Sequence, residues 1–420
     1  MRTTKSMRLS LIILAALICR SMTASEKLHA ENWPTWRGPQ RNGLSSETDL
    51  PTSWSVTENI KWKTPLPGLG IASPVIWEDR IYLTESDGKR LNTLHIFCLD
   101  RETGTELWRR KFWGTAPTLY HGSKSSMATP VPVTDGDFVY AFFGTGDVFC
   151  LSRDGELMWQ RSLAKEYGQF ENRFAASSSP ILHEDLLIVQ CDHYGESYVL
   201  AIDKATGANR WKADRPECWL SWASPQLLPA EKESPAELLV SGSHKMDAYD
   251  PLTGERKWTI RGLERECIPT PLFGHGMAYV VSGPKGFTFA IRRGGAGEIT
   301  DSHIEWKTNR GAPFVPSTIL VGDYYYLVDD AGILTCLDAH TGDAKWQKRL
   351  NGAFTASPVA GDGKIYFTDE AGVTTVIKSN VPEYEELARN ELGEPGYASL
   401  AISHGNIYIR TPSGLYCIGK

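Results

Sequence analysis

The sequence predicts an all-β fold, namely an eight-bladed β-propeller built from four-stranded antiparallel blades. Three observations indicate this fold. One phrase of eleven residues recurs along the chain, its copies are spaced about 46 residues apart, and short β-branched and aromatic runs fill each interval. A period of this length is typical of propellers, in which each repeat forms one sheet and neighbouring repeats bury each other's faces.

The repeated phrase is clearest in CLDRETGTELW, which ends at Trp108, and in CLDAHTGDAKW, which ends at Trp346. Weaker copies end at Trp159, Trp211 and Trp258. In all five copies a glycine stands four residues before the tryptophan. Aspartate accepts hydrogen bonds from the backbone that follows it, and glycine supplies a positive φ at little cost. The phrase therefore predicts a tight turn that leads into an outer strand.

The tryptophans of the repeats are predicted to be structural. On the outermost strand of a blade, an indole can wedge against the neighbouring blade and bury roughly 150–250 Å². The tryptophans assigned this role are Trp108, Trp159, Trp211, Trp258, Trp306 and Trp346.

The first position of the phrase is always small and apolar. Its occupants along the chain are Cys98, Cys150, Ala201, Ala248, Ala290, Cys336, Val376 and Cys417. Because Ala and Val serve as well as Cys, the position requires small size and not thiol chemistry. The cysteines beyond the signal segment are widely spaced and form no CxxC pair, so no disulfide framework is predicted.

Each repeat also contains the other strands of a blade. A lead of serine or threonine and proline, such as ASPV from Ala72, precedes a β-branched and aromatic strand such as RIYLT. Only EYEELARN, near residue 383, has a pattern that indicates a helix.

The ring is predicted to close through the N-terminal strand. The eighth repeat begins at Tyr397, but the sequence ends at LYCIGK before an outer tryptophan strand. NIKWKTPL carries Trp62 where a repeat tryptophan belongs, so this strand is expected to complete the last blade and leave only short sheet edges. The predicted domains are a signal peptide over 1–24, an N-terminal extension over 25–58 that packs on the propeller, and the propeller over 59–420.

The first 24 residues have the pattern of a secretory signal. Three basic residues precede an apolar run over 9–18, and a cleavage site is expected after Ala24 or Ala30. The run is too short to span a bilayer, so no transmembrane span is predicted. The protein is expected to be periplasmic or secreted. An alternative stays open, in which Cys19 is the lipid anchor of a lipoprotein, although Ile18 stands where such signals usually have Gly, Ala or Ser.

Several function classes are excluded by the sequence. The net charge is −6 and no basic stripe is present, so nucleic acid is not an expected partner. No P-loop, HExxH, GxSxG or EF-hand loop is present. The ten histidines are scattered without ligand spacing, so no metal site is predicted.

The Asp-x-x-Thr-Gly-x-x-x-Trp phrase, the Ser-Pro leads and the eight-fold count resemble the PQQ-like (pyrroloquinoline-quinone-type) β-propeller repeats over about residues 60–420. The opening WPTWRGPQRNGLS, from Trp33 to Ser45, is similar to the start of secreted bacterial members. The resemblance implies either a quinoprotein dehydrogenase that binds PQQ and calcium, or an exported scaffold like the propeller lipoprotein that assists outer-membrane protein assembly.

The dehydrogenase branch implies features that can be sought in the sequence. Its members carry adjacent cysteines over the quinone, a tryptophan beneath it, acidic and amide calcium ligands, and a catalytic aspartate. No adjacent cysteines are present, and no aspartate matches the catalytic one. Glu171 and Asn172, with Trp219 and Trp222 nearby in the repeat order, are the candidate cofactor-binding residues in this alternative.

Candidate ligand-binding residues lie where the repeats disagree, in the connections from each outer strand to the next blade. These connections are expected to surround the mouth of the central channel. The candidates are Trp113, Tyr120, His121, Lys124, Arg173, Trp219, Trp222, Arg265, Glu266, Arg310, Phe314, Phe354 and Tyr397. For each aromatic residue, packing beneath a loop is the alternative. For the basic residues, the alternative is a solvated or loop-bracing charge.

The sequence thus favours an exported, monomeric and non-catalytic scaffold without a cofactor, whose partner is an envelope protein or polysaccharide bound at the mouth. The alternative is a PQQ- and calcium-dependent dehydrogenase.

Overall fold

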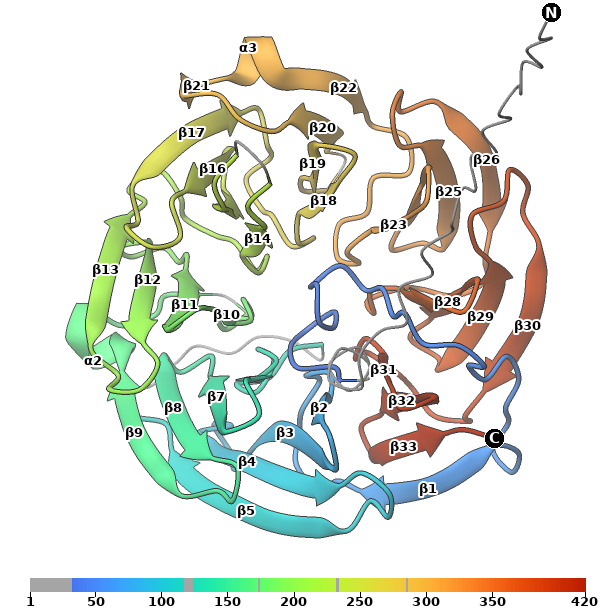
Figure 1. The fold of residues 1–420 in the computed structure, drawn as a ribbon. Coiled ribbons are helices and arrows are strands. Elements are labelled where there is room, and N and C mark those ends of the chain that lie inside the picture. The colour runs from blue at the N-terminus through green and yellow to red at the C-terminus, as the bar shows by residue number, and fades with distance from the viewer. Residues whose placement is uncertain (1–31, 117–123, 173, 232–233, 285) are drawn as a thin grey trace, which may run out of the picture.

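Eight β-sheets form a closed ring around a central axis in the computed structural model (Figure 1). The structure describes residues 32–116, 124–172, 174–231, 234–284 and 286–420. The predicted signal peptide and Cys19 therefore lie outside the described residues. Within these ranges, no helix has the length and apolar character needed to cross a membrane. The prediction of an eight-bladed propeller is confirmed.

The first four blades follow one another along the chain, each with four consecutive strands from the axis outward. Blade 1 is formed by β2 (Val75–Trp77), β3 (Arg80–Asp87), β4 (Thr93–Asp100) and β5 (Glu106–Trp113). Blade 2 is formed by β6 (Val133–Thr134), β7 (Phe138–Phe142), β8 (Asp147–Ser152) and β9 (Leu157–Ser162). Blade 3 is formed by β10 (Ile181–His183), β11 (Leu186–Cys191), β12 (Tyr198–Asp203) and β13 (Asn209–Asp214). Blade 4 is formed by β14 (Gln226–Leu228), β15 (Glu237–Gly242), β16 (Lys245–Tyr249) and β17 (Arg256–Arg261).

The remaining blades complete the circle. Blade 5 is formed by β18 (Leu272–Gly274), β19 (Met277–Val281), β20 (Thr288–Arg292) and β22 (Ile304–Thr308). Blade 6 is formed by β23 (Ile319–Val321), β24 (Tyr324–Val328), β25 (Ile333–Asp338) and β26 (Ala344–Arg349). Blade 7 is formed by β27 (Val359–Gly361), β28 (Lys364–Thr368), β29 (Val373–Lys378) and β30 (Glu386–Glu391). Blade 8 is formed by β31 (Ala401–Ser403), β32 (Asn406–Arg410), β33 (Gly414–Ile418) and β1 (Ile60–Pro65).

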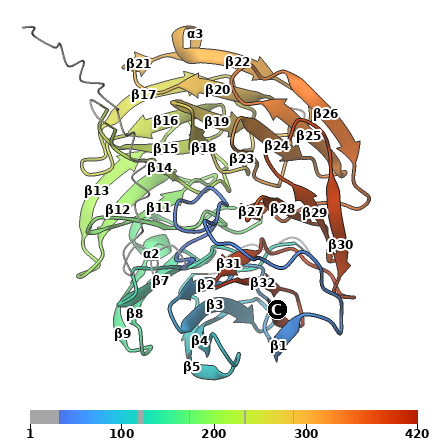
Figure 2. The ribbon, with the colours of Figure 1, turned by 45° about the vertical axis from the view of Figure 1, so that its right-hand side comes forward.

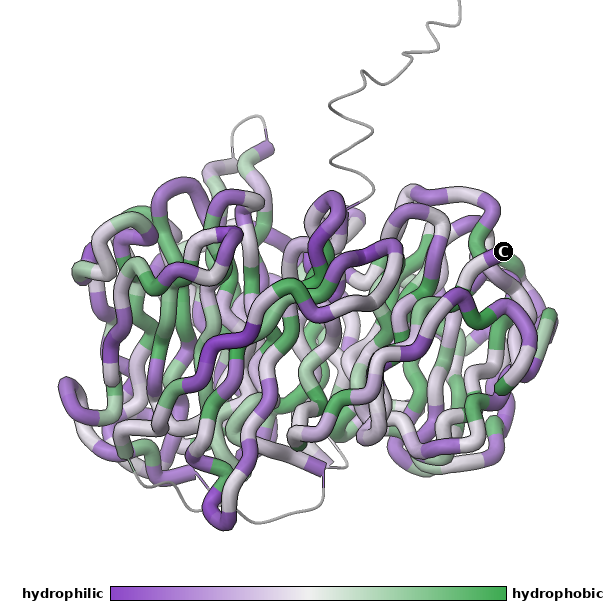
Figure 3. The backbone as a smooth tube through the Cα atoms, turned by 90° about the horizontal axis from the view of Figure 1, so that it is seen from below, coloured by the Kyte–Doolittle hydropathy of each residue, from purple (hydrophilic) through white to green (hydrophobic). Residues whose placement is uncertain are grey.

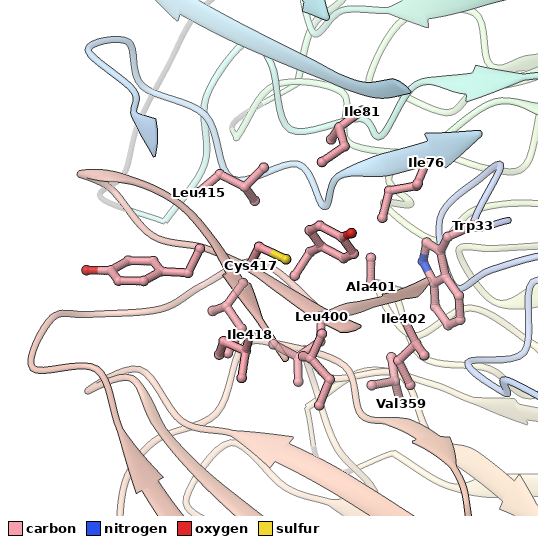
Figure 4. Close-up of a cluster of buried hydrophobic side chains, with 14 of the residues drawn as sticks. Trp33, Ile76, Ile81, Val359, Leu400, Ala401, Ile402, Leu415, Cys417 and Ile418 are labelled. Atoms are coloured by element: carbon pink, nitrogen blue, oxygen red, sulfur yellow. The ribbon is translucent and has the colours of Figure 1, made fainter. Parts of the chain in front are cut away.

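Blade 8 closes the ring as predicted, because its outer strand comes from the N-terminal part of the chain. Strand β1 lies beside the C-terminal end of the chain (Figure 2). It pairs antiparallel with β33, and Trp62 lies opposite Cys417. The seam between blades 8 and 1 is filled by a buried apolar cluster that includes Cys417, Leu400 and Ile81 (Figure 4).

The repeat tryptophans pack against the next blade, which confirms their predicted position. Trp108, for example, donates its indole N–H to the carbonyl of Arg153 in blade 2 at 3.0 Å. Its ring lies against Gly155, whose φ is 83°. The indoles of Trp62, Trp159, Trp211 and Trp306 make the equivalent contact with Gly104, Gly207, Gly254 and Gly342.

The small apolar position of the phrase faces these tryptophans across each outer strand pair. Cys98 lies opposite Trp108, and Cys336 lies opposite Trp346. The cysteines of the described chain are all buried and free. Burial raises the pKa of the Cys98 and Cys336 thiols to about 12, so both stay protonated and unreactive at neutral pH.

Three local features differ from expectation or add to it. The helix expected at EYEELARN is wrong, because residues 386–391 form the outer strand β30, with Ala388 opposite Val376. Sheet pairing here overrides local propensity.

A short helix, α2 (Leu163–Tyr167), follows blade 2 with Ser162 as its N-cap. A second, α3 (Thr300–His303), follows β21 (Gly297–Glu298), which pairs with β17 as a fifth strand of that sheet.

The segment over 32–58 crosses the face of the disc on which the first and second strands of each blade are joined (Figure 1). Trp33 forms a bridge with Ile76 of blade 1, and the side chain of Arg37 donates to the Thr318 carbonyl before blade 6 at 2.5 Å. Further along, the Leu50 N–H donates to Asp362 of blade 7. The segment therefore ties together blades on different sides of the ring. Many turns at both faces of the disc are hydrophilic, whereas hydrophobic stretches run through the strands between them (Figure 3).

Candidate functional site

The two faces of the disc carry different parts of each repeat. One face, here called the connection face, holds the loops from each outer strand to the next blade and the turns between second and third strands. The other face holds the Asp-x-x-Thr-Gly turns and the N-terminal segment. The long connections, in which the repeats disagree most, therefore lie on the connection face.

A cavity of about 580 Å³ lies on the ring axis, because six of the eight leads, and the residues just before the other two, contribute to its lining. Trp36 of the N-terminal segment also lines it. The lining consists of Trp36, Ile71, Ser73, Lys124, Ser125, Thr129, Val131, Phe174, Ser177, Ser179, Trp222, Ser224, Glu266, Ile268, Phe314, Val315, Thr355, Ser357, Tyr397 and Ser399. The cavity is thus lined by apolar and aromatic side chains and by hydroxyl groups, with Lys124 and Glu266 as the charged residues among the described lining.

The hydroxyl groups of the Ser/Thr-Pro leads connect the blades around this cavity. The backbone N–H of Ser179 donates to Ser224 Oγ at 2.9 Å, and the N–H of Ser224 donates to Thr270 Oγ1 at 3.1 Å. In the same way, the backbone N–H of Thr270 donates to Ser317 Oγ, that of Ser317 donates to Ser357 Oγ, and that of Ser357 donates to Ser399 Oγ. The leads therefore form a belt of hydrogen bonds. The sequence signal for this belt was the repeated Ser or Thr itself.

Between blades 8 and 1 a buried arginine makes the inter-blade bonds. The Arg410 Nη1 donates to the carbonyls of Ala72 and Thr84 at 3.2 and 2.9 Å. Burial lowers the pKa of Arg410 to about 10, while the nearby Glu85 carboxylate acts in the opposite direction. Glu85 also accepts from Arg109 at 2.8 Å. The closing seam is thus held by side chains that the repeat does not predict.

Charged groups are few at the rim of the cavity. Lys124, which precedes blade 2, forms an ion pair with Glu370 of blade 7 at 2.5 Å, and Thr355 also donates to this carboxylate at 2.7 Å. Glu266, in contrast, has no hydrogen-bond or ion-pair partner among the described side chains. Among the described lining residues, the charged groups are therefore one neutralised cation and one unpaired carboxylate.

The aromatic side chains of the rim are fixed by their backbone and ring contacts. The indole N–H of Trp222 donates to the Ala175 carbonyl at 3.0 Å, and the ring lies 5.9 Å from that of Phe174. The backbone N–H of Phe314 donates to Asp330 Oδ2 at 2.7 Å. Burial raises the pKa of this Asp330 carboxyl, although the backbone donors oppose the shift.

A second group of aromatic side chains extends the rim over blades 3 and 4. This group, here called the aromatic arc, comprises Phe174, Tyr194 and Trp219, which are 38%, 45% and 45% exposed. Arg265 donates to the Tyr194 hydroxyl at 3.2 Å, and Trp219 contacts His244 edge-on. Large exposed aromatic groups of this kind mark interaction surfaces.

The residues predicted from the sequence do not all reach the cavity. Five of them line it, namely Lys124, Trp222, Glu266, Phe314 and Tyr397. Four are exposed but lie outside its lining, namely Trp113, Trp219, Arg265 and Arg310. Phe354 is only 1% exposed and belongs to a buried cluster between blades 6 and 7, so it has a packing role. Tyr120, His121 and Arg173 lie outside the described residues.

Sequence reasoning missed six apolar lining residues, namely Trp36, Ile71, Val131, Phe174, Ile268 and Val315. Phe174, Ile268 and Val315 stand beside predicted residues in the connections, and Trp36 comes from the N-terminal segment. The only signal for Trp36 was the aromatic opening WPTWRG, and nothing in a repeat pattern places that segment at the axis.

The candidate cofactor ligands do not assemble in the cavity. Glu171 is exposed, and Asn172 is buried with its Oδ1 accepting the N–H of Phe174 at 3.1 Å. Neither residue lines the cavity, where Glu266 is the one carboxylate among the described lining residues. Calcium takes about 6–8 oxygen ligands. The described lining therefore does not fit a calcium-dependent quinone site.

Comparisons with known proteins agree with the propeller. The model of a family described as outer membrane protein assembly factor BamB matches residues 46–218 and 195–420. No curated protein sequence matches significantly.

Three solved structures share the fold. The BamB structure from Moraxella catarrhalis has a TM-score of 0.59 and 16% identity, with 85% of this chain and 97% of that chain covered. A europium-containing methanol dehydrogenase has a TM-score of 0.68 and 11% identity, with 92% and 91% covered. The quinohemoprotein alcohol dehydrogenase from Comamonas testosteroni has a TM-score of 0.64 and 13% identity, with 93% and 81% covered. Together with the family match, these structures confirm the predicted resemblance to PQQ-like propellers.

Proposed function

The chain belongs to the family of the outer membrane protein assembly factor BamB, and we propose that it is an exported, non-catalytic scaffold that binds a protein partner at its connection face. The observation that carries this proposal is an axial cavity whose rim continues into the exposed aromatic arc of Phe174, Tyr194 and Trp219. Export rests on the signal pattern of residues 1–24.

The shape and chemistry of the rim favour a protein partner. Aromatic rings and arginine carry a large share of the energy in protein interfaces, and the arc combines Trp219, Tyr194 and Arg265. Because Glu266 lacks a partner among the described side chains, it offers a place for a basic group of the partner. A polysaccharide would need many hydrogen-bonding side chains, but several of the lining hydroxyls already accept backbone N–H groups within the belt.

The ionisable groups around the cavity favour binding over catalysis. General acid–base chemistry needs positioned groups within hydrogen-bond reach of a reacting atom. Among the described lining residues, Lys124 is already engaged by Glu370, and Glu266 stands without a neighbouring base. These features support a scaffold in preference to a dehydrogenase.

A crosslinking experiment tests the proposal. A photo-crosslinking residue is placed at Trp219 on the connection face, and a matched one is placed at Leu252, which is 51% exposed in an Asp-x-x-Thr-Gly turn on the other face. In envelope fractions of the native host, we expect a discrete protein adduct from position 219 and none from position 252. The yield of this adduct should fall when Arg265→Ala or Glu266→Gln is introduced into the same protein.

Equal crosslinking from both positions would contradict the assigned face.

A titration with PQQ and Ca²⁺ tests the alternative that the protein is an enzyme. Saturable binding accompanied by dye-linked alcohol oxidation would replace the scaffold by a quinoprotein dehydrogenase. Adducts with polysaccharide at position 219 would retain the face but reject the protein partner.

A further inference from the structure

We propose that His275, Asp323 and His340 form a binding site for a transition-metal ion of the Zn²⁺ type. The three side chains lie on the face opposite the connection face, in turns of blades 5 and 6, which are neighbours in the ring (Figure 1). One ligand atom from each residue can be chosen so that all three lie within 4.8 Å of one another. The site is independent of the cavity and of the aromatic arc.

The geometry of the three side chains is close to that of a metal site. The imidazole rings of His275 and His340 lie with their centroids 4.4 Å apart and their planes tilted by 50°. The Nε2 of His340 lies 3.3 Å from Asp323 Oδ1. Ligand atoms on a tetrahedral zinc ion, with bonds of about 2.0–2.2 Å, are separated by about 3.4 Å. His275 Nε2 also lies 2.9 Å from the Gly322 carbonyl oxygen, to which it can donate, so His275 Nδ1 is the ring nitrogen left to bind an ion while this hydrogen bond is kept.

The backbone holds the three residues in place before any ion binds. His275 occupies the turn between β18 and β19 with a φ of 52°. The turn that carries His340 is fixed to the turn of Asp323, because the N–H of Ala339 donates to the Asp323 carbonyl at 2.9 Å. The Ala339 carbonyl in turn accepts the indole N–H of Trp306 at 3.0 Å. The repeat's own tryptophan contact thus positions the proposed ligands.

Two other junctions of the ring hold an acid–base pair at the same place. At each such junction, the turn between the first and second strands of one blade faces the turn between the third and fourth strands of the next blade, which is the Asp-x-x-Thr-Gly turn where the repeat is complete. Between blades 1 and 2, Glu78 pairs with Arg153 at 2.9 Å. Between blades 2 and 3, Asp135 pairs with Lys204 at 3.0 Å. Between blades 5 and 6, two imidazoles replace this acid–base pair, so a bound cation would supply the charge that those two junctions obtain from a basic side chain.

The ligand types select the ion. Imidazole nitrogens suit Zn²⁺, Ni²⁺ and Cu²⁺, whereas Ca²⁺ and Mg²⁺ prefer a set of oxygen ligands. Two imidazoles and one carboxylate with a solvent-exposed fourth position match the three-protein-ligand form of zinc sites. Sequence reasoning did not find the site, because its residues come from three turns and have no short spacing in the chain.

The direct test is calorimetric titration of the tag-free, chelator-treated protein with ZnCl₂ at neutral pH. We expect one saturable site per chain, and His275→Ala and His340→Ala should each weaken binding by at least about tenfold. His404→Ala is the matched control, because His404 occupies the same turn position in blade 8 with the same φ of 52°. It should bind zinc like the unmodified protein. Thermal melting of each variant without metal shows that the fold is retained.

A second readout distinguishes a formed site from loose association. Co²⁺ bound to the protein should give the visible absorption of a tetrahedral site, and Asp323→Asn should reduce its intensity. The proposal is overturned if no saturable zinc binding is seen. It is also overturned if His404→Ala weakens binding as much as His275→Ala, or if bound Co²⁺ shows only the weak absorption of the hydrated ion.

Discussion

The indole of Trp108 lies against Gly155 of the next blade, so closely that a Cβ on Gly155 would meet the ring at 2.7 Å. Gly155 therefore serves two purposes, since its φ of 83° forms the turn and its missing side chain admits the ring. The repeated phrase is thus a turn that holds the tryptophan of the preceding blade.

Replacing this glycine should destabilise the protein more than positive φ alone explains. Alanine at a positive φ costs about 1–2 kcal/mol, and overpacking against the ring adds about 1–3 kcal/mol. Gly405→Ala is the control, because Gly405 has a φ of 70° but a Cβ there would meet nothing within 4 Å. Urea unfolding should show the larger loss for Gly155→Ala. Equal losses would mean that the ring contact is unimportant.

The indole N–H groups of two repeat tryptophans should contribute differently to the free energy of unfolding. Trp108 donates to Arg153, whereas the buried N–H of Trp346 finds no acceptor among the described residues, because blade 7 lacks the full phrase. Trp108→Phe should therefore cost about 1 kcal/mol more than Trp346→Phe. Chemical denaturation of the two variants measures the difference, and a larger loss at Trp346 would contradict this account.

A buried charge cluster should make Arg215 a sensitive position. Arg215, Asp192 and Asp247 are all fully buried, and Arg215 bonds to the two carboxylates at 3.0 and 2.9 Å. The two carboxylates raise the pKa of Arg215 well above its usual value against the effect of desolvation. Arg215→Met leaves Asp192 without a cationic partner among the described residues and leaves Asp247 only its longer ion pairs with Lys245 and Arg256, at 3.4 and 3.9 Å, so it should cost about 3–5 kcal/mol.

The control for that substitution is a matched pair on the surface. Arg210→Met removes an ion pair with Asp203 in which the arginine is about half exposed, so it should cost at most about 1 kcal/mol. Adding Asp192→Asn and Asp247→Asn to Arg215→Met should recover part of the lost stability. No recovery would indicate that shape, and not charge, determines the loss.

Glu394 should make the closing blade sensitive to acid. Burial acts to raise the pKa of this carboxyl, but hydrogen bonds from Ser413, Tyr416 and Lys63 prevail and lower it to about 2. Because the folded pKa lies below the unfolded value of 4.5, the stabilisation is complete above pH 4.5 and is lost as the pH falls toward 2.

Urea unfolding of the unmodified protein and of Glu394→Gln at pH 7 and pH 3 measures this contribution. The unmodified protein should lose more stability between these pH values than the variant, which has no carboxyl to protonate. An identical loss in both proteins would assign the acid sensitivity to other groups.

The blades and their closure could be predicted from the sequence because the information is periodic and local. The same small residue, turn glycine and tryptophan recur in register, and each repeat buries its faces against its neighbours. Trp62 could be assigned to the last blade for the same reason, since it fills the one position that the eighth repeat lacks. The helix expected near residue 383 failed where a local pattern disagreed with the repeat.

The candidate sites depended on contacts between distant residues, which only the tertiary structure could decide. Lys124 meets Glu370 across 246 residues, Phe354 turns into the core, and Trp36 reaches the axis from outside the repeats. His275 and His340 become neighbours only because blades 5 and 6 are joined side by side. A repeat pattern determines what every blade shares. The side chains that differ between blades take their places only when the ring closes, because their neighbours come from other blades.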